Sequence, residues 1–428
     1  MPLLQASCIR ATMFASMYAH AAQQIIVAST THACNMNCIN TMTPEQRSDA
    51  IIRFLVNQAD PLARSSGGDE WSSASDVLDA LSTDVDRTTI FRDIQKLLLE
   101  GVLDQRGETR SRTYRLSKDS LPFLKWELSQ PPASRAKVLY KPSILGMYEP
   151  NKTFWLSDVQ RAKLASLSKS NESVDDASYR CVMNSLLIDL SYASSRLEDV
   201  NISWLDTKSL VELGERPDGL SEKEFRIVMN HKNAIQFICE NRLDLQLTKR
   251  DLLDVHKLLS VGLLGNPADE GQLRRGTVFF TESAYQPLSI PQVLTEQVEA
   301  YCEKVGMIAD SFERAFFTMA MIPYLQPFQD CNKRTSRLCM NTPLLMNSLA
   351  PFSFSQIDRR AYTFGLLSFY ERGRPEFLAE AFVEAYARSA PKYAELLAVV
   401  QAGGSLSTIT IDKQGESVVG PTARRPRP

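Results

Sequence analysis

The sequence predicts a mainly α-helical protein in which a small α+β module precedes a larger helical body. Apolar residues recur at helical spacing from about residue 151 to 400. Strand-like patterns are confined to two places, around residues 102–116 and 277–281. Hydrophobic residues make up 44% of the chain and charged residues 23%, which is ordinary globular composition and excludes a disordered chain.

Charge, the length of apolar stretches and cysteine content exclude further classes of protein. The chain has 48 basic and 50 acidic side chains in 428 residues, so any basic surface must be local. The best apolar stretch, 315–325, is shorter than the roughly 18 residues that a bilayer span needs, and it contains Pro323. Eight cysteines are too few for a disulfide scaffold. We therefore expect a cytoplasmic protein that makes no contact with a membrane.

The first 42 residues fit neither part of the predicted fold. They mix small, apolar and amide side chains without a clear period, and Met42 directly precedes a helix-like segment. We interpret residues 1–41 as an over-extended start. The alternative is a secretory signal, for which Arg10 supplies a basic start but His20 interrupts the apolar region.

Residues 43–117 predict three helices followed by a polar ribbon of two strands. The third helix begins near Asp86, and its apolar residues Ile90 and Ile94 lie on one face. Arg92 and Lys96 fall on the opposite face. This order of elements suggests a winged helix-turn-helix.

Positive charge is concentrated in the second half of this module. Residues 87–115 contain seven basic and four acidic side chains, whereas residues 43–116 contain ten and thirteen. A helix in the major groove with a basic ribbon beside the backbone would bind double-stranded DNA through Arg92, Lys96, Arg110 and Arg112. The alternatives are a protein-docking module and a solvated arginine surface.

The rest of the chain divides into a linker, the helical body and a tail. Five prolines disfavour a continuous helix and predict a linker over residues 118–150. Within the body, 151–400, the expected helices are 177–198, 222–240, 249–264, 290–305, 312–321 and 335–346. Residues 401–428 are rich in Gly, Ser, Thr and Pro, which predicts a disordered tail.

Candidate chemistry is concentrated at one polar turn in the body. Asp330 and Asn332 precede a helix that is expected to begin near Lys333. Free amides at a helix start, together with Lys333, Arg334 and Arg337, would suit a polyanionic phosphate. Asp330 would repel phosphate by itself, so a divalent cation bridging phosphate oxygens is its natural partner. An ordinary capped turn is the alternative.

The turn resembles the signature of the Fic (Fido) family, His-Pro-Phe-x-Asp-Gly-Asn-x-Arg-x-x-Arg. The matched positions are Pro327, Phe328, Asp330, Asn332, Arg334 and Arg337. The stretch SYASSRLEDV is similar to the inhibitory helix of the family, with Ser194 and Glu198 one turn apart. The resemblance covers roughly residues 145–395, and a winged helix in front of a Fic domain is a known family architecture.

Members of this family typically transfer AMP from ATP to a hydroxyl group on a target protein. The resemblance implies a helical Fic domain with ATP as ligand and Mg²⁺ held by Asp330. The implied nucleotide-binding residues are Asp330, Cys331, Asn332, Lys333, Arg334 and Arg337. Glu198 would pair with Arg337 in the place of the γ-phosphate, which implies autoinhibition. A β-hairpin flap would position the target through Thr277, Val278, Phe279, Phe280 and Tyr285.

Two positions depart from the family signature. Gln326 occupies the place of the catalytic histidine, and an amide cannot accept a proton at neutral pH. Cys331 replaces a glycine, where any side chain penalises a left-handed backbone. We expect its thiol to be a small buried hydrophobe rather than a nucleophile, and His256 to be a packing histidine.

Three functions follow from these matches and departures. The first is a protein adenylyltransferase in which another group accepts the proton. The second is a nucleotide-sensing pseudoenzyme whose winged helix reports to DNA or to a partner. The third is an interaction scaffold that binds neither nucleotide nor DNA tightly.

Overall fold

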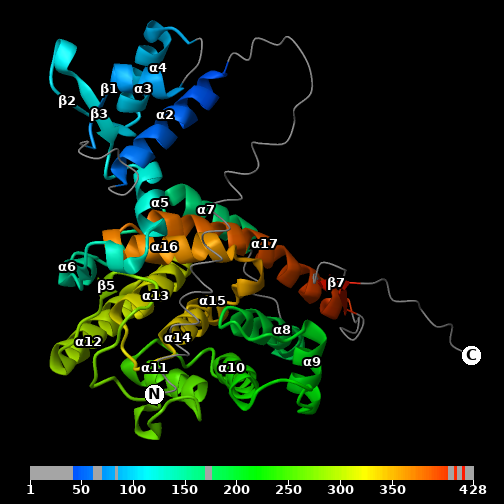
Figure 1. Ribbon diagram of the computed structural model, residues 1–428. Coiled ribbons are helices and arrows are strands. Elements are labelled where there is room, and N and C mark those ends of the chain that lie inside the picture. The colour runs from blue at the N-terminus through cyan, green and yellow to red at the C-terminus, as the bar shows by residue number, and fades with distance from the viewer. Residues whose placement is uncertain are drawn as a thin grey trace, which may run out of the picture. The chain divides into compact units, whose positions relative to one another are not determined.

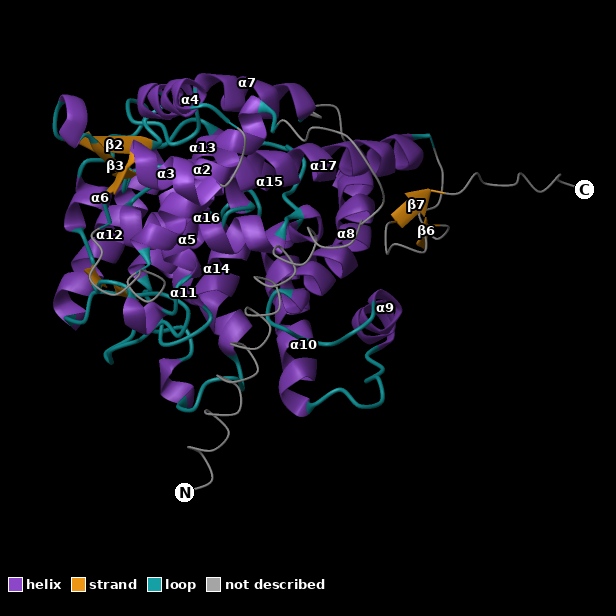
Figure 2. Ribbon diagram, turned by 45° about the horizontal axis from the view of Figure 1, so that its top comes forward, coloured by secondary structure: helices purple, strands orange, loops and turns teal. Residues whose placement is uncertain are grey.

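The computed structural model describes residues 42–60, 70–81, 85–168, 176–402, 409–411 and 417–419 (Figure 1). The chain forms two compact units, Met1–Ser120 and Leu121–Pro428. Helices dominate the described residues, and strands are few and short (Figure 2). The expected extension 1–41 lies outside the described residues, as does most of the expected tail 401–428.

The first unit combines three helices with a small antiparallel sheet. Its elements are α2 (Pro44–Ala59), β1 (Ser72–Ser73), α3 (Ala74–Leu81), α4 (Arg87–Leu99), β2 (Leu103–Arg106), η1 (Thr109–Ser111) and β3 (Thr113–Leu116). The strands are ordered β1-β3-β2, with Leu103 opposite Leu116. Asp86 caps α4 by accepting from the amides of Thr88 and Thr89. Helix and strand starts therefore follow the local signals of the sequence.

The core of this unit is the predicted apolar stripe of α4 packed against α2. Ile90 and Ile94 are buried with Ile51 and Leu55 of α2. Arg47 of α2 pairs with Asp93 of α4, with Nε 2.6 Å from Oδ2. This ion pair fixes the two helices side by side.

The second unit is a helical body with a few short strands. Its helices are α5 (Leu121–Ser129), η2 (Pro132–Ser134), α6 (Pro142–Gly146), α7 (Asp158–Leu167), α8 (Asp176–Arg196), α9 (Trp204–Leu213), α10 (Glu222–Glu240), α11 (Lys249–Ser260), η3 (Pro267–Asp269), α12 (Pro291–Met307), α13 (Ser311–Leu325), α14 (Asn332–Cys339), α15 (Thr342–Met346), η4 (Phe354–Gln356), α16 (Arg359–Arg372) and α17 (Glu376–Gln401). Its strands are β4 (Val138–Leu139), β5 (Tyr285–Gln286), β6 (Ile409–Ile411) and β7 (Ser417–Val419).

Helices α13 and α14 lie at the centre of this unit. They pack against each other, α11 packs on α14, and α16 packs on α13 (Figure 1). All of α13 after Ser311 is buried. The polar turn between α13 and α14 is therefore held by buried helices on both sides.

Helix α13 continues four residues beyond its expected end because Pro323 is accommodated inside it. A proline removes one backbone donor, which would leave the carbonyl of Met319 without its intrahelical partner. Ser336 Oγ of α14 donates to that carbonyl at 2.9 Å. The hydrogen bond across the helix pair compensates for the proline.

The segment expected to be a linker, 118–150, is packed into the second unit from Leu121 onwards. It forms α5, α6 and β4, which proline punctuation alone does not predict. Arg135 forms a buried ion pair with Glu371 of α16, with Nη1 2.7 Å from Oε1. Because a buried ion pair of this kind needs fixed partners, this segment is part of the helical body.

The expected β-hairpin at residues 277–281 is not formed. Among the described residues these five have no strand partner, and β5 starts only at Tyr285. There β5 pairs in parallel with β4. The buried side chain of Arg274 donates to the carbonyls of Gly276 and Leu288 and so holds both ends of the segment.

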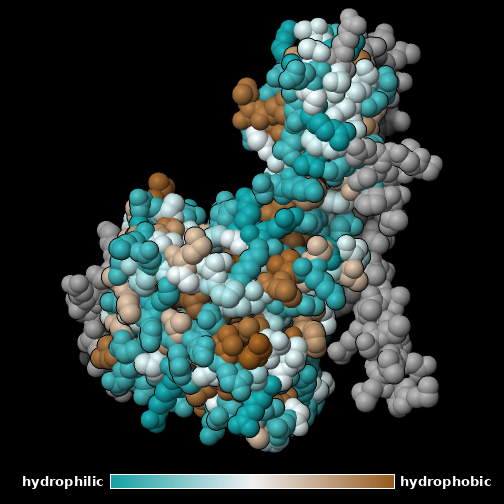
Figure 3. All heavy atoms as spheres, turned by 90° about the vertical axis from the view of Figure 1, so that its left-hand side faces the viewer, coloured by the Kyte–Doolittle hydropathy of each residue, from teal (hydrophilic) through white to brown (hydrophobic). Residues whose placement is uncertain are grey.

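The surface of the described chain is mostly polar. On the face shown in Figure 3, hydrophobic residues form small separate patches within a hydrophilic surface. No helix among the described residues is long and apolar enough to cross a membrane.

Candidate functional site

The turn between α13 and α14 contains two residues in the left-handed backbone conformation. Gln326 ends α13 at φ 49° and Cys331 precedes α14 at φ 62°. Within the described part of the chain, no side chain caps the start of α14. The first amides of a helix have no intrahelical acceptor, so the N–H groups at the start of α14 are left for an anion.

The amide of Gln326 is used to hold this turn together. Its Nε2 donates to the carbonyl of Pro323 at 2.7 Å, and its Oε1 accepts from Asn332 Nδ2 at 2.9 Å. Asn332 Oδ1 in turn accepts from the amide of Phe328 at 2.9 Å. Gln326 is buried and both ends of its amide are engaged, so it connects the two helices rather than presenting a free polar group.

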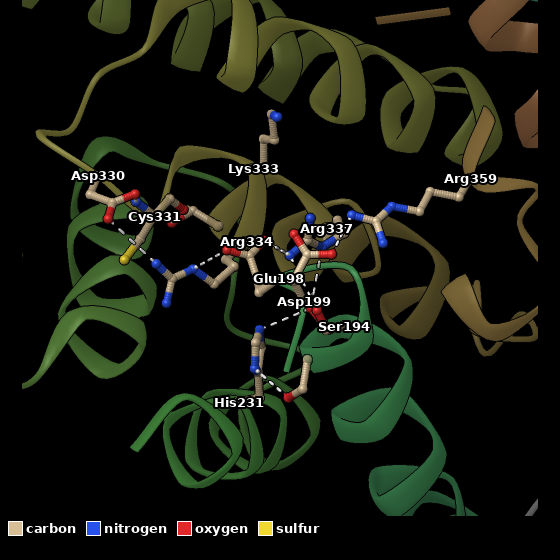
Figure 4. Close-up of polar contacts among 12 residues, drawn as sticks. Ser194, Glu198, Asp199, His231, Asp330, Cys331, Lys333, Arg334, Arg337 and Arg359 are labelled. Atoms are coloured by element: carbon tan, nitrogen blue, oxygen red, sulfur yellow. Dashed lines mark hydrogen bonds and ion pairs between the residues drawn. The ribbon is translucent and has the colours of Figure 1, made fainter. Parts of the chain in front are cut away.

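Two arginines of α14 converge on one carboxylate (Figure 4). Glu198 Oε1 lies 2.6 Å from Arg337 Nη2, and Glu198 Oε2 lies 3.2 Å from Arg334 Nε. Glu198 belongs to the turn that directly follows α8. Both guanidinium groups are buried, and both face the carboxylate rather than open water.

The charge of this cluster is set by the arginines. Burial raises the pKa of Glu198, but Arg337 and Arg334 outweigh burial and hold that pKa at about 2. Glu198 is therefore an anion at neutral pH, and the exposed carboxylate of Asp330 also lies near Arg334, at 3.7 Å. Among the described residues, the buried Nη1 of Arg334 has no hydrogen-bond partner. The cluster retains capacity for a second anionic group.

Ser194 and His231 complete the inner side of the cluster. Ser194 Oγ accepts from Arg337 Nε at 3.2 Å and lies 2.9 Å from His231 Nε2. His231 is fully buried on α10, and its Nδ1 lies 3.2 Å from Ser195 Oγ. The sequence places Ser194 in an inhibitory segment, but it gives no local signal for His231.

His256 lies on the outer side of the turn, where the sequence indicated only a packing role. Its ring stacks on Phe328, with ring centroids 3.8 Å apart. Its Nδ1 accepts from the amide of Gly271 at 3.1 Å, so the ring proton is on Nε2, which faces the carbonyl of Asp330 at 3.3 Å. Both nitrogens are engaged, so His256 does not supply the proton acceptor that Gln326 lacks.

Three further residues predicted to bind nucleotide differ in their exposure and in their contacts. Cys331 is buried, and burial raises the pKa of its thiol to about 12, so it is not a thiolate nucleophile. Lys333 points away from Glu198, towards Glu282 (Figure 4). The side chain of Asp330 is 66% exposed and lies 3.7 Å from Arg334.

Asp330 can hold a metal ion only together with other ligands. The described residues contain no cluster of three or more His, Cys, Asp or Glu side chains that could bind a metal. One exposed carboxylate suits a Mg²⁺ ion that keeps its waters and is bound mainly by substrate phosphates. The residues therefore fit a cation that arrives bound to a nucleotide. The cation would neutralise part of the phosphate charge.

The predicted flap residues are divided between the surface and the core. Thr277 is exposed and Phe279 is 77% exposed, whereas Val278 and Phe280 are half-buried. Tyr285 is 1% exposed, and its hydroxyl donates to the carbonyl of Tyr324 at 2.8 Å. Tyr285 is therefore a core residue, and the expectation that it contacts a target protein is wrong.

The predicted DNA-binding residues of the first unit are only partly described. Arg92 and Lys96 are exposed on α4, and Lys96 lies 3.8 Å from Glu100. Arg112 is half-buried, and the side chain of Arg110 lies outside the described part of the structure. Arg115 of the same ribbon pairs with Glu70 and Asp104.

Acid should destabilise the fold through its buried histidines. Burial is the main cause that lowers the pKa of His231 to about 3 and that of His256 to about 4. Below pH 6.5 the unfolded chain binds protons that the folded chain does not bind, so stability falls as pH falls towards these values. Each histidine lowers the free energy of unfolding by up to about 1.4 kcal/mol for each pH unit of acidification.

Urea unfolding at pH 7, 6, 5 and 4.5 measures this dependence. The variant His256→Gln should show a shallower loss of stability than wild type over the same range. An equal slope in the two proteins would contradict a neutral, buried His256.

Comparison with known proteins agrees with this geometry. Residues 246–344 match the model of the Fic/DOC family. "Protein adenylyltransferase Fic" of Aedes aegypti is 25% identical over 217 residues, which are 49% of this chain and 42% of that protein. "Protein adenylyltransferase fic-1" of Caenorhabditis briggsae is 26% identical over 179 residues, which are 40% of this chain and 34% of that protein. The matches thus span less than half the length of these relatives.

Solved Fic structures are also similar to this chain. Fic-1 from C. elegans shares 19% identity, with a TM-score of 0.47, over 56% of this chain and 74% of that chain. A Fic domain containing signaling protein from Bacteroides thetaiotaomicron shares 18% identity, with a TM-score of 0.45, over 58% of this chain and 98% of that chain.

Proposed function

We propose that this chain binds ATP at the start of α14, as a protein adenylyltransferase-like Fic protein that Glu198 holds in an inhibited state. The observation that supports this function best is the carboxylate of Glu198 between Arg334 and Arg337. A carboxylate held by two guanidinium groups occupies the position that suits a phosphate. Arg334 projects from the first turn of α14, whose start has no side-chain cap among the described residues.

Inhibition follows from competition for the same donors. A guanidinium group that is paired with Glu198 cannot also pair fully with a γ-phosphate, so docking of the carboxylate disfavours the productive ATP pose. The buried Nη1 of Arg334 has no hydrogen-bond partner among the described residues, so a phosphate that displaces Glu198 would gain a donor there. Binding and inhibition thus share one pair of side chains.

AMP transfer to a target hydroxyl requires a proton acceptor, and Gln326 cannot serve as one. Its amide is already bonded to Pro323 and Asn332. Loss of a general base typically lowers a rate by about 10² to 10⁴. We therefore propose that ATP binding is efficient once inhibition is relieved and that AMP transfer is slow. Exposed Thr277 and Phe279 are the flap residues left to contact a target protein.

The second candidate function is nucleotide sensing with a DNA-binding readout through the first unit. The exposed Arg92 and Lys96 on α4, followed by the antiparallel ribbon β2–β3, support a winged helix-turn-helix. Such a protein would couple ATP binding to DNA only if ATP favoured one state of the chain.

Stabilisation by Mg·ATP tests the proposed function. A ligand present at 100 times its Kd adds about 2.7 kcal/mol to the free energy of unfolding, so saturating Mg·ATP should raise the unfolding temperature by several degrees. AMP and Mg²⁺ without nucleotide serve as controls. No shift with Mg·ATP, in wild type or in Glu198→Gly, favours the scaffold and contradicts nucleotide binding.

The DNA-binding candidate makes a separate prediction. Binding to a duplex should weaken steeply between about 50 and 200 mM salt, because phosphate contacts release counterions. Arg92→Ala and Lys96→Ala should each lower affinity, whereas Arg53→Ala on the exposed face of α2 should not. Mobility shifts of a random duplex measure this effect, and salt-independent or absent binding would count against it.

A further inference from the structure

A buried histidine connects the inhibitory segment to a third helix. His231 projects from α10 and makes no contact with solvent. Its Nε2 lies 2.9 Å from Ser194 Oγ, and its Nδ1 lies 3.2 Å from Ser195 Oγ. Both serines belong to the last two turns of α8, and the turn carrying Glu198 follows directly (Figure 4).

The direction of these hydrogen bonds can be assigned from chemistry. Arg337 Nε can only donate, so Ser194 Oγ accepts from it at 3.2 Å. Two arginines near this ring favour a bare nitrogen on the side of Ser194. Ser194 Oγ therefore donates its own proton to Nε2, and the ring proton lies on Nδ1, which faces Ser195 Oγ; the ring also hydrogen-bonds to the backbone of Ile227. The chain of bonds runs from Arg337 through Ser194 to a neutral imidazole.

The end of α8 packs on α10 and η4, and its polar contacts differ in strength. The backbone of Ser194 accepts from Arg337 Nη2 at 3.5 Å, which is weaker than the side-chain contacts. On the outer side, Asp199 Oδ1 lies 2.6 Å from Arg359 Nη2, but both side chains are more than half exposed. An exposed pair contributes little, so the buried link to His231 is the stronger anchor of the two.

We infer that His231 is a positioning residue that keeps the Glu198 turn in its inhibitory place by fixing Ser194 against Arg337. This inference rests on the proposed function, because the turn is inhibitory only if ATP competes with Glu198. When the histidine link is removed, the end of α8 is fixed less firmly against Arg337 and Glu198 leaves the arginines more readily. The consequence is tighter ATP binding, even though no residue that contacts ATP has changed.

Two substitutions of similar polarity separate this role from a general packing role. The side-chain carbonyl of glutamine can reach the position of Nε2, whereas that of asparagine reaches only as far as Nδ1. His231→Gln should therefore keep the bond to Ser194 and bind Mg·ATP as wild type does. His231→Asn should lose that bond and bind Mg·ATP about tenfold more tightly, as expected for one buried hydrogen bond.

Calorimetric titration of Mg·ATP into the full chain measures both affinities, and each variant is repeated together with Glu198→Gly. Without Glu198 there is nothing to position, so His231→Asn and His231→Gln should then have equal affinities. Ser194→Ala removes the same link from the other side and should also tighten binding, which covers the case in which His231→Asn does not fold.

The outcomes separate this inference from the proposed function. Wild-type affinity in folded His231→Asn or folded Ser194→Ala overturns the inference, provided that Glu198→Gly alone binds ATP more tightly. The inference is also overturned if His231→Asn increases the affinity for Mg·ATP equally with and without Glu198. If Glu198→Gly changes nothing, or if no variant binds Mg·ATP, the proposed function fails and the inference fails with it.

Discussion

Histidine at position 326 should raise target labelling by α-labelled ATP about 10²- to 10⁴-fold when Glu198→Gly is also present. Gln326→His supplies an imidazole that can accept the proton of the target hydroxyl near neutral pH. Glu198→Gly is included so that inhibition does not mask the gain. Labelling in a lysate of the source cell, followed on a gel, measures the effect and needs no purified target protein.

Gln329→His is the matched control for this experiment. It places an imidazole three residues away at an exposed position, so it should not raise labelling. Unfolding temperatures of both variants separate loss of the Gln326 hydrogen bonds from loss of chemistry. If neither Glu198→Gly nor its combination with Gln326→His modifies any protein, the transferase function is wrong and nucleotide sensing is the remaining role.

Removal of the inhibitory carboxylate should tighten ATP binding by about tenfold or more. In wild type, Mg·ATP must first displace Glu198 from two buried guanidinium groups, and the affinity is reduced by the fraction of molecules in which the carboxylate is docked. Glu198→Gly abolishes this competition. Calorimetric titration with Mg·ATP reports the change in Kd directly.

Asp199→Gly is a close control for the same titration. It removes one negative charge at the neighbouring residue, which has a positive φ of 60° that glycine adopts without strain. Asp199 pairs with Arg359 rather than with the arginines of α14. Its loss should leave the ATP affinity unchanged, and equal gains in both glycine variants would show that general electrostatics, not docking of Glu198, set the affinity.

Local signals predicted much of the candidate site. The polar residues Asp330 and Asn332 predicted a helix start, and α14 begins at Asn332. The spacing of Arg334 and Arg337 along one helix placed both groups at that start. The pairing of Glu198 with Arg337 followed only from the resemblance to Fic proteins, because the two residues lie far apart in the chain and no periodicity relates them.

Apart from the pair of Glu198 and Arg337, contacts between distant segments could not be predicted. His231 and His256 carry no local motif, and their roles arise only when α10 and α11 pack near α14. The buried contacts of Arg274 with the carbonyls of Gln326 and Gly276 likewise depend on the tertiary fold. With the contact to the carbonyl of Leu288, Arg274 also holds the base of the predicted flap.

The central claim is that the start of α14 binds the phosphates of ATP through its arginines. Titration of Mg·ATP into Glu198→Gly, and into Glu198→Gly combined with Arg337→Met, tests that claim most directly. Methionine keeps an apolar stem but removes the guanidinium group, and without Glu198 no buried carboxylate is left unpaired at this cluster. We predict that the second protein binds Mg·ATP at least about 100-fold more weakly, as expected for loss of a buried, charge-assisted phosphate contact. Equal affinities in two folded proteins would contradict the claim.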